Sequence, residues 1–222
     1  MFAVSHLLGF GVGSGAQFSY AYVSNYSDAT NTSSYSFAGC SLGTADSTRK
    51  VVVVIKGGDA GLGFTVSSVT VAGVAASLVV GDTSGNSENR VEIWSAAVPS
   101  GTTGTIAVTW SGTKSQCGIG VYAIYGASAS AYATGTSSSG TTTTHTSSID
   151  IPAEGCVIAV GGCASATATW TNADENFDIV VESPQNMSAA SKLYASAQVA
   201  LTITMTTSSS ASAGLCCASW GA

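Results

Sequence analysis

The stretch RKVVVVIKG at residues 49–57 decides the fold. Five consecutive β-branched residues, Val51–Ile55, stand there between basic residues, with no polar side chain among them. A strand with one face in water alternates apolar and polar residues, whereas a continuous apolar run is typical of a strand buried on both faces. The stretch therefore predicts a central strand with both faces covered.

Strand patterns recur along the rest of the chain about every ten residues, with turn residues between them. The clearest alternation is found in segments 89–98, 105–112 and 116–127. In the last segment Cys117 and Val121 share one face of the expected strand, while Gly118 and Gly120 lie on the other. Glycines on that face would permit a neighbouring layer to approach closely.

Helix patterns are nearly absent, because no window of about 12 residues combines a 3.6-residue period with good helix formers. About a dozen strands are enough for two packed sheets. We therefore expect an all-β fold, an antiparallel β-sandwich of the jelly-roll or immunoglobulin-like type, with an extended N-terminal arm. In this prediction residues 1–16 form the arm and residues 17–222 a single sandwich domain.

Residues 134–148, TGTSSSGTTTTHTSS, are low in complexity and leave two interpretations open. They could be a disordered linker that divides the chain into two halves. Thr-rich runs are also good strand formers, so the same segment could be an exposed edge strand.

The chain is poor in charge. Only 8% of its 222 residues are charged, against an average of about 25%, and the hydrophobic fraction is 45% with a mean hydropathy of +0.35. A protein alone in solution usually covers its surface with charges of both signs. The shortage indicates a surface that lies largely against other subunits; the alternative is an ordinary secreted β-protein rich in Ser and Thr.

The charge pattern also bears on partners. The net charge is −6, and the six basic residues are scattered. We expect no nucleic-acid partner, because no basic stripe is present to neutralise phosphates. We expect no membrane partner, because the sequence has neither a basic amphipathic helix nor an apolar run near 18 residues.

The opening stretch MFAVSHLLGFGVGSG, residues 1–15, fits a signal peptide poorly. It has no Lys or Arg, its apolar run is interrupted by Ser5 and His6, and glycines then alternate along it. An N-terminal arm fits this pattern better than an export tag. The six cysteines show no metal-ligand spacing, and we expect them to be mostly reduced core residues, which fits assembly in a reducing cytoplasm.

No catalytic constellation is apparent. The two histidines, His6 and His145, stand near no recognisable nucleophile motif. The acidic segments 81–90 and 172–178 could hold calcium through oxygen atoms, but such segments are more often solvated loops. We therefore expect a protein that is not an enzyme, with no catalytic residue, cofactor or metal.

Aromatic side chains on a β-surface can stack on glycans. Trp94 and Trp170 stand among polar neighbours, so they are the better candidates for exposed glycan contacts. The alternative is that both lie in the core or in a subunit interface.

Several stretches together resemble small β-sandwich proteins encoded in the structural-gene regions of tailed bacteriophages. The resemblance covers residues 35–130 and is carried by framework strands and turns. The stretches that carry it are SLGTADSTRKVVVVI, VTVAGVAASLVV, VEIWSAAVPSGTTGTIAVTWSG and GIGVYAIYGA. The closing stretch AGLCCASWGA shows a weaker similarity. It implies a virion protein made in the host bacterial cytoplasm, and it supplies no catalytic residues.

The resemblance also implies a function. In such assemblies a short apolar arm commonly inserts between neighbouring subunits, a role that falls here to Phe2, Val4, Leu7, Leu8 and Phe10. We expect a virion surface protein, a capsid decoration (cement) or head-fibre subunit that binds the major capsid protein or other virion proteins, as a homo-oligomer and preferably a trimer. The alternative is a tail-fibre or receptor-binding module that recognises host glycans.

Overall fold

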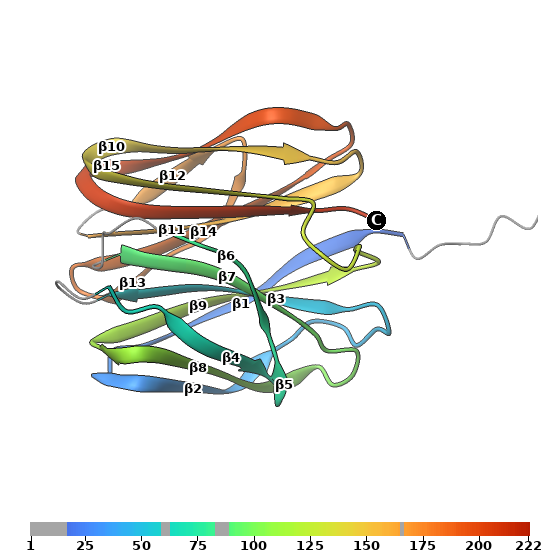
Figure 1. Cartoon of the computed structure of the whole chain (residues 1–222), viewed down its shortest axis with the longest axis horizontal. Helices are drawn as coiled ribbons and strands as arrows, with labels where there is room; N and C mark the ends of the chain where they lie inside the picture. Colours follow the sequence, from blue (N-terminus) through green and yellow to red (C-terminus); the bar gives the residue numbers. More distant parts are fainter. Residues whose placement is uncertain (1–16, 59–62, 83–88, 165–166) are drawn as a thin grey trace, which may run out of the picture.

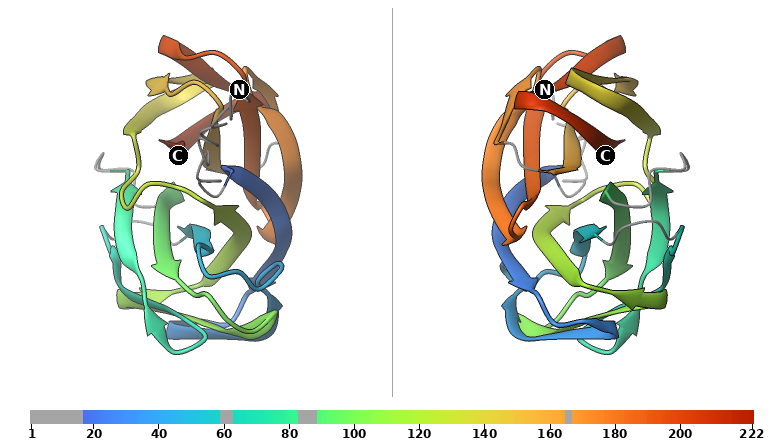
Figure 2. Two further views of the ribbon diagram at one scale, coloured as in Figure 1. Left: turned by 90° about the vertical axis from the view of Figure 1, so that its right-hand side faces the viewer. Right: turned by 90° about the vertical axis from the view of Figure 1, so that its left-hand side faces the viewer.

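The computed structural model describes residues 17–58, 63–82, 89–164 and 167–222, which form three stacked antiparallel β-sheets (Figure 1). Figure 2 shows the same stack from the right-hand and left-hand sides of Figure 1. The prediction of an all-β, antiparallel sandwich is confirmed, with three sheets in place of the two expected. The predicted arm and all five of its candidate contact residues lie outside the described residues. No helix in the described part of the chain has the length and apolar character needed to cross a membrane.

The middle sheet has the strand order β1-β9-β3-β7-β6. Its strands are β1 (Ser19–Asp28), β3 (Lys50–Gly58), β6 (Ser77–Gly81), β7 (Arg90–Ala97) and β9 (Gln116–Tyr125). Strand β3 lies at its centre, paired with β7 on one side and β9 on the other, and Val51–Ile55 are fully buried. The prediction of a central strand with both faces covered is confirmed.

One outer sheet has the order β2-β8-β4-β5. Its strands are β2 (Thr32–Ser41), β4 (Val66–Val71), β5 (Val74–Ala75) and β8 (Thr103–Lys114). Strands β4 and β5 form a tight hairpin, in which Ala72 and Gly73 both have positive φ, 50° and 81°. Two consecutive residues of this conformation match the twist of the flanking strands. The chain then leaves this sheet, and β6 pairs with β7 in the middle sheet.

The other outer sheet, which we call the β10–β15 sheet, has the order β10-β15-β11-β14-β13, with β12 also paired to β15. Its strands are β10 (Ala133–Ile151), β11 (Gly155–Ala164), β12 (Ala168–Thr171), β13 (Asp174–Glu182), β14 (Gln185–Tyr194) and β15 (Gln198–Trp220). Residues 134–148 lie within β10, which pairs with β15 at the end of this order. The edge-strand interpretation of this Thr-rich segment is therefore confirmed, and the linker interpretation is wrong.

Two apolar cores separate the three sheets, and the middle sheet contributes to both. On β7, Trp94 and Ala96 pack into the core shared with the β2-β8-β4-β5 sheet. Val91 and Ile93, which alternate with them, pack into the core shared with the β10–β15 sheet. This second core joins residues from Phe18 to Trp220, so both ends of the described chain contribute to it.

The sheets approach closely where the middle sheet carries glycines. A Cβ atom added at Gly118 would lie 2.8 Å from a methyl carbon of Val181, and one added at Gly120 would lie 2.6 Å from the ring of Phe177. Both neighbours come from β13. Since real Cβ atoms essentially never approach other atoms this closely, the expectation that these glycines admit a neighbouring layer is confirmed.

All six cysteines are buried and unbridged. Cys216 and Cys217 lie on opposite faces of β15, in different apolar clusters. Burial in apolar surroundings raises the pKa of the Cys117 and Cys156 thiols to about 12. The expectation that the cysteines act as small core residues is confirmed.

Candidate functional site

Trp94 does not lie on the surface. Its side chain is 7% exposed, and its indole Nε1 donates a hydrogen bond to Oε2 of Glu92 at 2.8 Å. Of the two interpretations left open for Trp94, the structure supports the core, because β7 belongs to a sheet covered on both faces. Trp94 therefore offers no face on which a sugar ring could stack.

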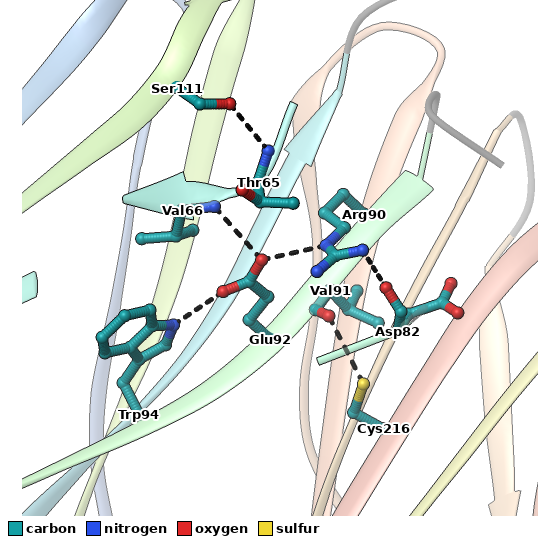
Figure 3. Close-up of polar contacts among 9 residues, drawn as sticks. All are labelled: Thr65, Val66, Asp82, Arg90, Val91, Glu92, Trp94, Ser111 and Cys216. Atoms are coloured by element: carbon teal, nitrogen blue, oxygen red, sulfur yellow. Dashed lines mark hydrogen bonds and ion pairs between the residues drawn. The ribbon is translucent and has the colours of Figure 1, made fainter. Parts of the chain in front are cut away.

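Glu92 is the centre of a buried polar network (Figure 3). Its carboxylate is 1% exposed. In addition to the Trp94 indole, it accepts hydrogen bonds from the backbone amide of Val66 at 3.1 Å and from Nε of Arg90 at 2.9 Å. Arg90 also donates to the backbone carbonyl of Asp82. Both carboxylate oxygens are thus engaged, and the network ties β4 to β7 across two sheets, which is a structural role.

Trp170 is half-buried on β12. Its indole Nε1 donates to Oγ of Ser188 at 2.8 Å, and that hydroxyl donates to the carbonyl of Phe177. Its ring packs against the apolar clusters around Met205 and Ile203. The indole nitrogen is therefore occupied within the protein, and only part of the ring is left at the surface. A glycan contact at Trp170 stays a prediction.

The titratable residues singled out from the sequence and described by the structure contact other groups of the protein or lie buried in it. His145 is 1% exposed on β10, and burial lowers its pKa. Asp178 accepts a hydrogen bond from the backbone amide of Ala168 at 2.8 Å, and Asp174 pairs with Lys192 on the surface. Among the described residues, no three His, Cys, Asp or Glu side chains gather as a possible metal site. His6 lies outside the described residues.

A second buried polar cluster was not foreseen from the sequence. Lys56, at the end of β3, is fully buried, and its Nζ donates to Oε1 of Gln185 at 2.7 Å. Burial lowers the pKa of this amine to about 7. The one sequence signal was the pair Gly57-Gly58 after the lysine, since two residues without side chains leave room beside a strand for a long side chain.

Lys114 is also fully buried. Its Nζ lies 5.3 Å from the ring centroid of Trp110 and 5.5 Å from that of Phe64. Aromatic faces stabilise a nearby ammonium group electrostatically. This arrangement holds the end of β8 in place.

The surface has a groove of about 460 Å³ beside β6, which we call the β6 groove. Its lining includes Lys50, Leu78, Val79, Ala97, Ala131 and Thr134. Leu78 is 52% exposed, and two further exposed apolar residues, Val74 and Tyr132, adjoin lining residues in the sequence. The lining contains a single charged side chain, Lys50, whose Nζ donates to the backbone carbonyls of Ser128 and Ala129.

The groove therefore presents apolar and small polar groups with little free charge. This arrangement suits contact with another protein surface better than capture of an ionic ligand. No protein-family profile matches this chain, and it has no match among the curated proteins or the solved structures.

Proposed function

We propose that this chain is a non-enzymatic structural protein of a tailed-bacteriophage virion, a capsid decoration or head-fibre subunit. It is made in the host cytoplasm, assembles as a homo-oligomer, preferably a trimer, and binds the virion surface. The proposal rests on the resemblance of residues 35–130 to phage virion proteins and on the low charge of the chain. The structural observation that supports it best is the β6 groove.

The β6 groove supplies a cohesive contact. Burying an exposed side chain of the size of Leu78 contributes about 1.5–3 kcal/mol, and Tyr132, 60% exposed, adds aromatic area. Since Lys50 already donates to two backbone carbonyls, a partner surface would meet almost no unsatisfied charge there. In this proposal the arm of residues 1–16 adds a second, separate contact with the neighbouring subunit.

Binding to phage shells tests the proposal. The purified chain is mixed with undecorated shells of the phage that encodes it, and the bound fraction is measured after sedimentation. We expect the full chain to co-sediment and a chain lacking residues 1–15 to remain in the supernatant while keeping its β-sheet spectrum.

A matched pair of variants separates the groove from the rest of the surface. Leu78→Asp places a charge in the β6 groove, so we expect shell binding to fall at least tenfold. Val199→Asp changes a residue that is 84% exposed and does not line the groove, and we expect binding to stay at the wild-type level. A well-folded, monomeric chain with no affinity for shells or tails would refute the proposal.

The alternative is a receptor-binding module of a tail fibre. Trp94 is buried and cannot contact a glycan, but Tyr132 presents an exposed aromatic ring to solvent. Under this alternative the chain would bind host surface polysaccharide, and Tyr132→Ala would weaken that binding. If immobilised polysaccharide retains the wild-type chain but not the Tyr132→Ala variant, the result favours the alternative.

A further inference from the structure

A buried amine and a half-buried carboxamide connect the middle sheet to the β10–β15 sheet. Lys56 lies at the end of β3 and Gln185 at the start of β14, 129 positions apart in the sequence. Nζ of Lys56 lies 2.7 Å from Oε1 of Gln185. Since a carbonyl bond is about 1.2 Å long, the amine nitrogen lies within about 4 Å of the carboxamide carbon. Productive attack distances are about 3–3.5 Å, so a small side-chain rotation brings the two atoms into range.

Glycines hold the lysine in this position. A Cβ atom at Gly162 of β11 would lie 2.8 Å from Cγ of Lys56, so the lysine stem packs directly on that backbone. A Cβ atom at Gly58 would lie 3.0 Å from Nζ of Lys56 and 2.5 Å from Nε2 of Gln116. The side chain of Gln116 therefore lies beside the amine, and its buried Oε1 accepts no hydrogen bond from any described residue.

The surroundings of Lys56 favour the neutral amine. No carboxylate forms an ion pair with it among the described residues. The groups that interact with it electrostatically are the thiols of Cys117 and Cys163, the ammonium of Lys114 and the more exposed carboxylate of Glu182. Desolvation lowers the pKa of Lys56 from 10.5 to about 7, so about half of the molecules carry a nucleophilic, neutral amine at that pH.

We propose that Lys56 and Gln185 join in an intramolecular isopeptide bond. Nζ of Lys56 attacks Cδ of Gln185 and forms a new C–N bond. The bond between Cδ and Nε2 of Gln185 then breaks, and Nε2 leaves as ammonia, carrying its own two protons and one proton from the lysine amine. Oε1 remains as the carbonyl oxygen of the new amide, and the proton passes from the attacking lysine nitrogen to the leaving nitrogen.

This reaction balances without any oxidant, reductant or further reactant. Its product is a covalent link between β3 and β14, which closes a long loop of the chain and joins two sheets that otherwise contact each other non-covalently. The inference does not depend on the proposed virion function.

Mass spectrometry of the full chain tests the inference. The purified protein is held at mildly alkaline pH, then denatured, weighed intact and digested for peptide mapping. We expect an intact mass lower than the sequence mass by one ammonia, and a branched peptide joining Lys56 to Gln185. Separate linear peptides containing Lys56 and Gln185, recovered in full from a protein shown to be folded by circular dichroism, would overturn the inference.

Two lysine variants control the experiment. Lys56→Arg keeps a hydrogen-bond donor but removes the nucleophilic amine, so we expect this variant to show its full sequence mass, with no loss of ammonia. Lys192→Arg, at an exposed lysine on β14, should lose ammonia as the wild type does. Because Lys56→Arg could disturb the buried site, the wild-type peptide map alone decides the outcome if that variant does not fold. Loss of ammonia from a folded Lys56→Arg protein would also overturn the inference.

Discussion

The ring of Phe177 lies directly against the backbone of Gly120, so that a Cβ atom at residue 120 would come within 2.6 Å of its Cε1 and 2.7 Å of its Cζ. A methyl carbon of Val54 would lie 2.8 Å from the same Cβ atom. Gly120→Ala should therefore force the two sheets apart locally and lower the free energy of unfolding by about 1–3 kcal/mol, as overpacked cores do. Urea denaturation monitored by circular dichroism measures the change.

Gly140→Ala is the matched control for that substitution. Gly140 also lies in a strand, β10, and a Cβ atom there would meet nothing within 4 Å. We expect its unfolding free energy to be unchanged or raised by up to about 1 kcal/mol, because alanine reduces the freedom of the unfolded chain. Equal changes in the free energy of unfolding at the two positions would show that the close approach at Gly120 does not exclude a side chain there.

Replacing Glu92 tests the buried polar network. Glu92→Ala removes the acceptor for the Trp94 indole, the Val66 amide and the Arg90 guanidinium, which leaves Arg90 at 17% exposure without its ion-pair partner. We expect a loss of about 3–5 kcal/mol in the free energy of unfolding, measured by urea denaturation.

The surface ion pair between Lys192 and Asp174 provides the comparison, with side chains 39% and 71% exposed. Lys192→Ala should cost less than about 1 kcal/mol, because solvent screens such pairs. A loss of that small size for Glu92→Ala would contradict the structural role assigned to the network.

Buried thiols should resist alkylation. In the folded protein at neutral pH we expect iodoacetamide to label none of the six cysteines, and in denaturant all six, as counted by intact mass. Rapid labelling of one cysteine in the folded protein would place that thiol at the surface, contrary to the structure.

The same thiols should weaken the fold at alkaline pH. Burial raises the pKa of Cys117 from 9.0 to about 12. The folded state therefore keeps a proton that the unfolded state releases, so this contribution to stability is full below pH 9 and is lost as the pH rises from about 9 to 12.

Cys117→Ala isolates this dependence. The free energy of unfolding of the wild type should fall more steeply with pH in that window than that of the variant, by up to about 1.4 kcal/mol per pH unit. Urea denaturation of both proteins on either side of pH 9 measures the difference, and parallel profiles would contradict it.

The formation of the Lys56–Gln185 link should depend on pH through the neutral amine. The rate should rise as the pH increases through about 7 and level off above it, since the amine is then largely unprotonated. Freshly translated chain shifted to buffers on either side of that pH, and sampled for ammonia loss, gives the profile. A rate that is highest in the acid buffers would contradict the neutral-amine mechanism.

Local patterns predicted the strands and their neighbours well. The run Val51–Ile55 indicated a strand covered on both faces, and Gly118 and Gly120 indicated a closely packed layer, because both signals are properties of one strand. The Thr-rich segment of β10 was ambiguous because β-branched hydroxyl residues suit both edge strands and solvated linkers.

What the sequence could not provide was the pairing of distant segments. A strand covered on both faces implies a layer on each side, yet the number of strands alone suggested two sheets. Trp94 was a candidate for surface exposure, with the core as the alternative, because its polar neighbours in the sequence, Glu92 and Ser95, do not reveal that the outer sheet covers this face of β7. The contact between Lys56 and Gln185 joins residues too far apart for any local pattern to register.

The order of the strands along the chain has a consequence for biosynthesis. Every strand of the middle sheet and of the β2-β8-β4-β5 sheet comes from residues 19–125, and every strand of the remaining sheet comes from residues 133–220. The first half of the chain therefore leaves the ribosome with one apolar face of the middle sheet, around Val52 and Ile124, still uncovered. Nascent chains stalled at that point should be the species most prone to aggregation and most dependent on chaperones.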